Sequence, residues 1–233
     1  MKGYEAVTDG TLMNKTPVIF RLDGRSFHSY TKNFPKPFYD PLHSAMTHMA
    51  KYLLKEIQGA CFAYVQSDEV SILAVDYTSI ETQPWFGNRI QKSVSIAAAS
   101  ATAYFNRYIQ QTDLAIANHL PLFDCRAFNL PREEVINYFI WRQNDAVRNS
   151  INSAGQALYS QKELMYKSID QVVEMLKAKG VIWVDYPYAQ KYGTTIFTNK
   201  RKPGEEGDTI VELNRTPVFT EDRTFVNRYV FNN

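Results

Sequence analysis

Apolar runs typical of strands alternate with helical periodicities over the first half of the chain. Four runs rich in apolar and β-branched residues predict buried strands, at residues 17–22, 60–65, 70–75 and 120–128. After the first run, apolar side chains recur every three or four positions up to Gly59, which predicts one face of a helix: Leu42, Met46, Met49, Leu53 and Ile57. The alanine-rich residues 88–108 carry a similar stripe and predict a second helix.

The resulting order is strand, helix, strand, strand, helix, strand, which is that of the split βαβ unit. This unit forms a four-stranded antiparallel sheet with two helices on one face. We therefore predict an α+β fold with the topology shared by polymerase palms and RNA-binding RRM modules. Residues 1–130 would form this palm-like core.

The second half of the chain predicts a helical extension and a hairpin. Pro131, followed by two glutamates, favours the start of a helix that runs past Arg148. Ser168 is spaced from Gln171 as in a capping box, and a helix starting there would stop at Gly180. Strand-like residues 194–198 and 210–213 flank a charged turn from Lys200 to Asp208. We expect residues 131–233 to pack on the core as part of a single structural unit.

Composition excludes few classes of function. Lys and Arg number 26 against 24 Asp and Glu, so net charge gives no nucleic-acid signature. Cys61 and Cys125 lie in apolar stretches and read as buried thiols, while the four histidines lack zinc-ligand spacing. The longest uncharged stretch, residues 93–106, is shorter than the roughly 18 residues of a membrane span, and no signal peptide is evident. We expect a cytoplasmic protein without a membrane partner.

Two acidic motifs fall at strand ends. Asp23 and Gly24 follow the first strand, and Asp68 and Glu69 lie at the tip between the second and third strands. We expect the first strand to be central and to run beside the strand leading into that hairpin, which would bring the acids together. Convergent carboxylates repel, and two Mg²⁺ ions about 3.5–4 Å apart relieve the repulsion while activating an attacking oxygen and a leaving phosphate. Either motif alone would also suit an ordinary polar turn.

Several ordered motifs then give a specific resemblance: Arg21-Leu22-Asp23-Gly24-Arg25-Ser26-Phe27-His28, Phe34-Pro35-Lys36-Pro37, Gln66-Ser67-Asp68-Glu69, Phe123-Asp124-Cys125-Arg126 and Trp141-Arg142-Gln143-Asn144-Asp145. Together they resemble the tRNA(His) guanylyltransferase family and its relatives, the guanylyltransferase-like 3′-to-5′ polymerases. The resemblance covers about residues 15–195. It implies that ATP or GTP activates the 5′-monophosphate of a tRNA, which the 3′-hydroxyl of an incoming nucleotide then attacks.

The resemblance also implies roles for individual residues. Asp23, the Gly24 carbonyl and Asp68 would hold two Mg²⁺ ions, with Glu69 a further ligand or a supporting acid. Lys36 would act on charge that develops on a phosphoryl group during catalysis. The nucleotide would contact the residues around the first acid and before the second: Gly24, Arg25, Ser26, Phe27, His28 and Ser67.

Further cations and one amide are candidates for nucleotide contacts. Arg89 and Lys92 stand three apart on a predicted helix, where they face one side and could grip a triphosphate. Arg126 lies amid apolar residues of the fourth strand and favours an anionic partner. Arg142 and Asn149 fall on the following helix, facing nucleotide or RNA. A solvated helix surface is an equal alternative for the helical residues.

One departure from the family bears on the substrate. Where the eukaryotic tRNA(His)-specific enzymes read His-Ile-Asn-Asn, this chain carries Val147, Arg148, Asn149 and Ser150. Its segments 167–180 and 183–187 look closer to bacterial and archaeal relatives associated with template-dependent repair of 5′-truncated tRNAs. The implied partners are tRNA, ATP and GTP, with other nucleoside triphosphates as further substrates. The resemblance also implies a homo-tetramer.

Three alternatives stay open at this point. A dedicated tRNA(His) guanylyltransferase would share every motif above. A palm-fold nucleotide cyclase shares the topology and the acids, although its typical hairpin sequence is missing from the chain. A non-catalytic RRM module shares the strand order, but would carry stacking aromatics on its central strands rather than acids at one sheet end.

Overall fold

A single antiparallel sheet organises the protein. The computed structural model describes residues 1–116, 119–199, 208–213 and 215–231. Within these ranges the sheet has six strands in the order β4-β1-β3-β2-β5-β6. The strands are β1 (Val18–Arg25), β2 (Ala60–Gln66), β3 (Glu69–Ala74), β4 (Leu122–Asn129), β5 (Thr194–Asn199) and β6 (Thr209–Glu212).

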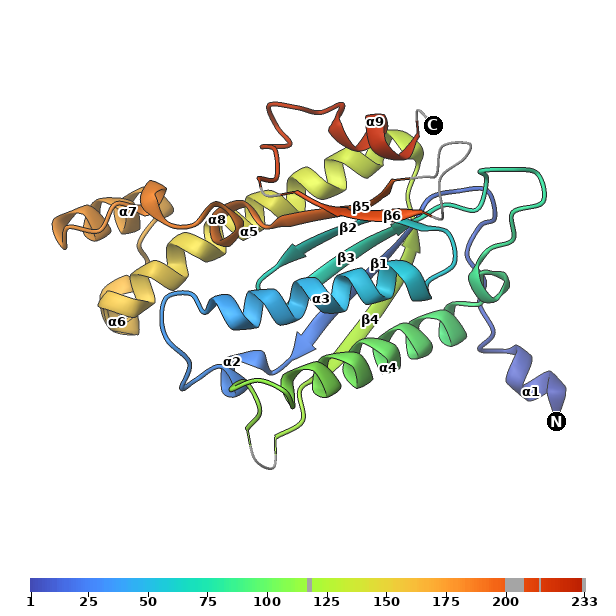
Figure 1. The fold of residues 1–233 in the computed structure, drawn as a ribbon, viewed down its shortest axis with the longest axis horizontal. Helices are drawn as coiled ribbons and strands as arrows, with labels where there is room; N and C mark the ends of the chain where they lie inside the picture. Colours follow the sequence, from blue (N-terminus) through green and yellow to red (C-terminus); the bar gives the residue numbers. More distant parts are fainter. Residues whose placement is uncertain (117–118, 200–207, 214, 232–233) are drawn as a thin grey trace.

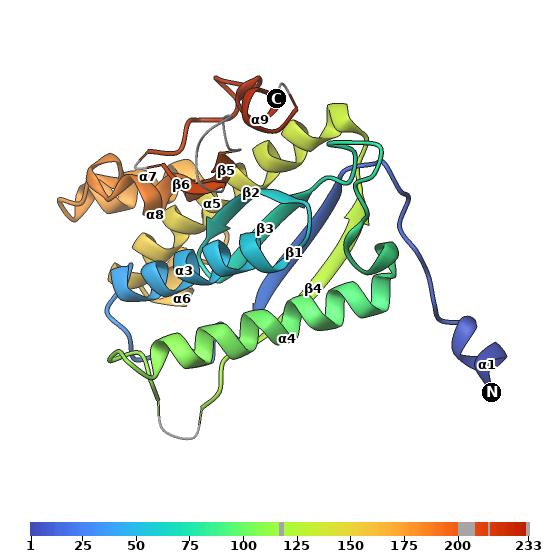
Figure 2. The ribbon, with the colours of Figure 1, turned by 45° about the vertical axis from the view of Figure 1, so that its right-hand side comes forward.

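Helices cover both faces of this sheet (Figure 1). Helices α3 (Asp40–Glu56) and α4 (Ile90–Ile109) pack on one face, where Phe20 and Leu22 of β1 enter the larger hydrophobic cluster. Helix α5 (Val135–Leu158) lies on the opposite face with α9 (Phe225–Val230), and Ile19 of β1 points into that cluster (Figure 2). The alternation along β1 thus feeds two cores, as expected for a strand buried on both sides.

The remaining elements are short: α1 (Lys2–Ala6), α2 (Phe27–Tyr30), α6 (Gln161–Leu164), α7 (Ile169–Ala178), α8 (Tyr188–Tyr192), and the 3₁₀ turns η1 (Trp85–Asn88), η2 (Arg132–Glu134) and η3 (Trp183–Asp185). Helix α1 buries none of its residues and stands away from the body (Figure 1). Helix α2 directly follows β1, so it lies beside the strand end that carries Asp23.

The predicted α+β fold and strand–helix order are confirmed, with three differences. The sheet gains β5 and β6 beyond the four predicted strands, because β5 pairs with the outer edge of β2. Strand β1 pairs with β3, which leaves the hairpin, and not with β2, which leads into it. The predicted helix after Pro131 opens with one 3₁₀ turn before α5. The predicted turn at 200–208 lies outside the described residues except for Asp208.

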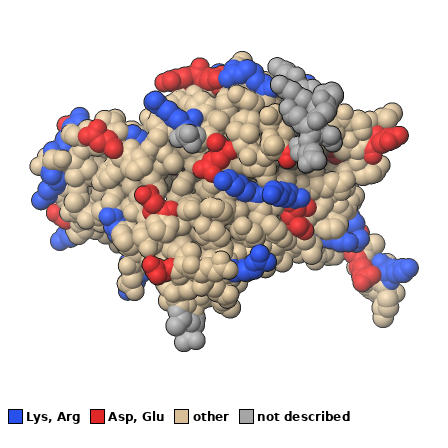
Figure 3. Space-filling model, viewed as in Figure 1, with Lys and Arg blue, Asp and Glu red and all other residues tan. Residues whose placement is uncertain are grey.

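Surface and interior agree with the composition. Cys61 is buried and Cys125 is partly buried. On the face shown in Figure 3, basic and acidic side chains are interspersed, in keeping with the small net charge. Among the described helices, we find none that combines the length and the apolar character needed to cross a bilayer.

Candidate active site

The sheet brings the two acidic motifs together at one end. Asp23 lies directly opposite Glu69 of β3 on one side and Asp124 of β4 on the other. The backbone N–H of Gly24 donates to the carbonyl oxygen of Asp68 at 3.0 Å. This bond fixes the tip of the β2–β3 hairpin against the end of β1, so the predicted convergence holds although β1 has a different neighbour.

Two residues form the hairpin tip itself. Ser67 adopts a left-handed conformation, with φ of 48°, which allows the tight reversal between β2 and β3. Its hydroxyl donates to Oδ1 of Asp68 at 3.0 Å. The serine therefore orients the carboxylate that it precedes.

Both metal-candidate aspartates resist ionisation in the bare protein. Burial raises the pKa of Asp23, and the neighbouring Asp124 carboxylate raises it further, against the opposing effect of Arg126 and Arg21. Burial raises the pKa of Asp68 to about 6, although the Ser67 hydrogen bond acts in the opposite direction. Burial at this sheet end thus disfavours the ionised form of both carboxyl groups, which a bound cation would favour.

The donor set fits a hard divalent cation. No group of three or more His, Cys, Asp or Glu side chains in the described part of the chain has the geometry of a complete metal site. Asp23 and Asp68 would supply carboxylate oxygens, and the Gly24 backbone would supply a carbonyl, with substrate phosphates and water filling the other positions. Mg²⁺ is commonly held by one or two carboxylates together with phosphate and water.

Glu69 is already engaged by the protein. Its two carboxylate oxygens accept hydrogen bonds from Nε and Nη2 of Arg142, each at 2.8 Å. Glu69 is 8% exposed and Arg142 6% exposed, so this bidentate pair is buried. Of the two roles predicted for Glu69, that of a supporting acid matches these contacts.

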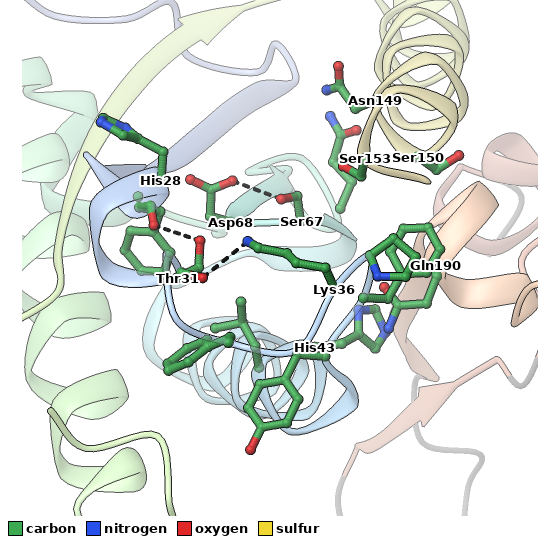
Figure 4. A pocket seen from close by; sticks show the side chains of 18 of the residues that line it. His28, Thr31, Lys36, His43, Ser67, Asp68, Asn149, Ser150, Ser153 and Gln190 are labelled. Atoms are coloured by element: carbon green, nitrogen blue, oxygen red, sulfur yellow. Dashed lines mark hydrogen bonds between the residues drawn. The ribbon is translucent and has the colours of Figure 1, made fainter. Parts of the chain in front are cut away.

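A first pocket of about 630 Å³ opens beside Asp68 (Figure 4). Predicted site residues that line it are Gly24, Ser26, Phe27, His28, Lys36, Ser67, Asp68 and Asn149. They come from β1, α2, the following loop, the hairpin tip and α5. In the close-up, Lys36 lies below Asp68 and Ser67, and its Nζ donates to the carbonyl oxygen of Thr31 at 3.1 Å. Lys36 therefore places its charge inside the pocket.

A second pocket of about 520 Å³ lies on the other side of the acids. Asp23, Glu69, Arg126 and Arg142 line it, and Asp68, Ser67 and Asn149 line both pockets. Asp68 thus stands in a shared wall, and Arg126 gives the second pocket a cation. Two adjoining pockets that meet at the Asp68 carboxylate could hold two phosphate-bearing molecules with their phosphates close together.

Three predicted contacts lie elsewhere. Arg25 is exposed at the end of β1 and lines neither pocket. Arg89 forms an ion pair with Asp9 at 2.9 Å, and Nζ of Lys92 lies 4.6 Å from the centre of the Phe86 ring. These two cations stand at the start of α4, and it is the other end of α4 that approaches the acids (Figure 1). Within one chain, the helix direction separates them from the carboxylates.

Arg21 and Gln66 are among the residues of the second pocket that were not assigned from the sequence. Arg21 lies directly opposite Arg126 on the neighbouring strand, on the face that carries Asp23. Its position two residues before Asp23 in a strand was a usable signal, because such residues share a face. Gln66 donates from Nε2 to Glu69 at 3.2 Å, and its buried Oε1 has no hydrogen-bond partner among the described residues.

Known proteins share the fold and parts of the sequence of this chain. The family model for tRNAHis guanylyltransferase matches residues 1–131. A bacterial tRNA(His) guanylyltransferase-like protein in complex with ATP superposes with a TM-score of 0.92 at 38% identity, over 100% of this chain and 98% of that one. A bacterial tRNA(His) guanylyltransferase-like protein in complex with GTP gives 0.83 at 37% identity, over 99% of this chain and 97% of that one.

A human probable tRNA(His) guanylyltransferase is 31% identical over 172 residues, which cover 70% of this chain and 54% of that protein. The chain spans about half the length of the human, mouse and cattle relatives that it matches. More than half of the chain matches the family model, and the match contains both acidic motifs. The chain therefore belongs to the tRNA(His) guanylyltransferase family of nucleotidyltransferases.

Proposed function

We propose that this protein is a Mg²⁺-dependent 3′-to-5′ nucleotidyltransferase that adds nucleotides to the 5′ end of tRNA. The observation that carries the proposal is the position of Asp68 in the wall between two pockets, beside Asp23 and tied to β1 through Gly24. One pocket would take the activating ATP or GTP. The other would take the second phosphate-bearing reactant.

The proposed reaction has two displacements at phosphorus. The 5′-phosphate of the RNA attacks the α-phosphate of ATP or GTP and displaces pyrophosphate. The 3′-hydroxyl of an incoming nucleotide then attacks the activated 5′-phosphate and displaces the nucleoside monophosphate. When bound by Asp23, Asp68 and the Gly24 carbonyl, two Mg²⁺ ions would neutralise the transferring phosphates and lower the barrier to attack.

The cationic side chains of the protein line different pockets and would act in different steps. Lys36 lies in the first pocket together with His28 and Ser67, where its ammonium suits charge developing during activation. Arg126 and Arg21 face the second pocket from neighbouring strands, where two opposed guanidiniums favour an anionic ligand. Asn149 lines both pockets and would contact nucleotide or RNA.

We further propose that addition follows a template. Val147 packs partly buried against the cluster of α5 and α7, and Arg148 is exposed and ion-paired with Asp145. An apolar side chain offers no hydrogen bond to a base, and an exposed arginine suits phosphate, which carries no sequence information. Base selection would then pass to the opposing RNA strand, as in repair of 5′-truncated tRNAs.

A further proposal concerns how the chain is organised and where it acts. Strand β5 of the second half pairs with β2 of the first, which favours one structural unit comprising a core at 1–130 and an extension at 131–233. The resemblance supports a homo-tetramer, and we also propose that the protein is cytoplasmic.

The test uses 5′-³²P-labelled tRNAs that lack their first nucleotide and carry each of the four opposing bases. Each is incubated with Mg²⁺, ATP and every nucleoside triphosphate in turn, with intact tRNA(His) as the comparison substrate. We expect addition of the Watson–Crick complement on several tRNA species and weak addition to a fully paired acceptor stem. A protein that adds G to intact tRNA(His) regardless of the opposing base, and ignores the truncated panel, would instead be a dedicated tRNA(His) guanylyltransferase.

A further inference from the structure

The carboxylate of Glu69 is surrounded by hydrogen-bond donors. Besides the two bonds from Arg142, Oε1 receives the Gln66 amide at 3.2 Å and the Ser71 hydroxyl at 3.4 Å. Ser71 in turn lies 2.7 Å from the Tyr138 hydroxyl of α5. Glu69 thus accepts hydrogen bonds from groups of β2, β3 and α5, although it follows Asp68 directly in the chain.

Within this network, Arg142 joins α5 to β3 through its ion pair with Glu69. It bonds Glu69 across 73 positions of sequence and also donates from Nη2 to Oδ2 of Asp145 at 2.8 Å. Its guanidinium lies 4.4 Å from the centre of the Trp141 ring. The buried side chain therefore has fixed partners on several sides, and its Nε and Nη2 donors are directed at protein carboxylates.

At least two links besides the β1–β3 pairing hold the hairpin tip. The first is the backbone bond from Gly24 to Asp68. The second runs through Glu69 and Arg142 to α5, a helix on the far face of the sheet from α3 and α4 (Figure 2). Losing the second link would leave a buried carboxylate without its counter-charge next to Asp68.

We propose that Arg142 is a positioning residue, which acts through Glu69 to hold Asp68 at the spacing from Asp23 that a divalent cation requires. Arg142 also keeps Glu69 out of the ligand set by occupying both of its oxygens. The proposal rests on the proposed function, since it assigns the cation to Asp23 and Asp68. It differs from the two other roles open to these residues, a metal ligand for Glu69 and a substrate phosphate contact for Arg142.

The experiment measures Mn²⁺ binding by electron paramagnetic resonance without nucleotide or RNA. The variants are Arg142→Met, Arg142→Lys, Glu69→Gln and the double variant Glu69→Gln/Arg142→Met, with Asp68→Asn as the reference for a lost ligand. Removing a residue that orients a metal ligand typically costs about 10–100-fold in affinity. We expect a loss of that size for Arg142→Met, partial recovery with Arg142→Lys, and a double variant no weaker than Arg142→Met alone.

Arg228→Met is the matched control, because Arg228 also pairs with a carboxylate, that of Asp222, but lies outside both pockets. Circular dichroism confirms folding, and should Arg142→Met fail to fold, Arg142→Lys and Glu69→Gln carry the comparison. Unchanged Mn²⁺ affinity in a folded Arg142 variant would overturn the proposal, as would a loss in Glu69→Gln equal to that in Asp68→Asn. If the wild type binds Mn²⁺ but does not extend RNA, the proposed function is wrong. The comparison of Mn²⁺ affinities among the variants still tests the role of Arg142.

A second readout separates positioning from phosphate binding. If Arg142 acts through the metal ligands, Arg142→Lys lowers kcat and raises the Mg²⁺ concentration needed for half-maximal rate, with little change in KM for the nucleotide. A rise in KM at unchanged kcat and unchanged Mn²⁺ affinity would mean that Arg142 binds substrate phosphate, and the proposal would fail.

Discussion

The ring of Phe27 lies against Gly24 so closely that a Cβ on Gly24 would come within 2.3 Å of the ring's Cδ2. Phe27 is 3% exposed and packs among Tyr30, Phe105 and Phe123, so it has little room to move. The absence of a side chain at Gly24 thus lets the first turn of α2 fold back over the strand end whose carbonyl is the candidate metal ligand.

Gly24→Ala should consequently damage the site. Forcing a methyl group into such a contact typically costs about 1–3 kcal/mol of stability, and the displaced strand end would also lower the rate of nucleotide addition. Urea unfolding and single-turnover extension measure the two effects. Gly3→Ala is the control, because a Cβ at Gly3 meets no atom within 4 Å. Equal stability and rate in Gly24→Ala and wild type would contradict the packing argument.

Features set by near neighbours in sequence were predictable. The capping box of α7 is one: Ser168 accepts from the Gln171 backbone, and the Gln171 side chain accepts from the Ser168 backbone. The hairpin tip with Asp68 is another, since both of its strands and its turn lie within one short segment.

Features set by tertiary packing were not predictable in the same way. The pairing of Glu69 with Arg142 depends on which helix covers the far face of the sheet. Hydrophobic periodicity along the sequence does not identify that helix. The separation of Arg89 and Lys92 from the acids follows from the direction in which α4 crosses the sheet. The addition of β5 to the edge of β2 likewise joins segments more than a hundred residues apart, and only a three-dimensional arrangement reveals it.

Replacement of either candidate metal ligand should separate activity from stability. Asp23→Ala and Asp68→Ala each remove a carboxylate that would hold Mg²⁺, so we expect activation and addition both to fall below detection. Because burial raises the pKa of Asp68 to about 6, its ionised form opposes folding at neutral pH in EDTA. In EDTA, the melting temperatures of Asp23→Ala and Asp68→Ala should therefore equal or exceed that of the wild type. The exposed Asp113→Asn is the control. Substantial turnover in either folded alanine variant would rule out the two-metal assignment.

Protonation of His43, which lines the first pocket, should lower the free energy of unfolding at acidic pH. Burial lowers the pKa of His43, with Glu212 and Asp40 acting in the opposite direction, and the ring nitrogen Nε2 lies 2.8 Å from the Thr194 hydroxyl. The unfolded chain, with a histidine pKa of about 6.5, binds the proton more readily than the fold. The neutral ring therefore contributes fully to the free energy of unfolding above the unfolded-state pKa. This contribution is lost as the pH falls toward the lower pKa of His43 in the folded protein.

The measurement is the free energy of unfolding in urea at pH 7.5 and pH 5. We expect the loss between the two pH values to be larger in wild type than in His43→Gln, which keeps an amide for Thr194 but does not titrate. Substitution of His48 by Gln on the same helix serves as the control. A wild type and a His43→Gln variant with the same pH dependence would show that His43 is not a site of acid sensitivity.

Lys36 offers the sharpest separation of the two chemical steps. It reaches the first pocket from the loop after α2, and its Nζ, bonded to the Thr31 carbonyl, keeps further donors for a phosphate. If this ammonium stabilises charge while the RNA 5′-phosphate attacks ATP, its removal should slow that step and leave the second largely unaffected. A tRNA that carries a 5′-triphosphate is already activated and bypasses the first step. Lys36→Ala should therefore slow extension of a monophosphorylated tRNA at least tenfold more than extension of the triphosphorylated form.

Single-turnover rates on the two RNAs, with the same truncated acceptor stem, give this ratio directly. Lys55→Ala removes an exposed lysine of α3 outside both pockets and should leave the ratio at its wild-type value. Equal losses on the two RNAs would place Lys36 in a role common to both steps, such as holding the RNA end. A larger loss on the triphosphorylated RNA would assign it to nucleotide addition, because the activation step contributes nothing to that rate.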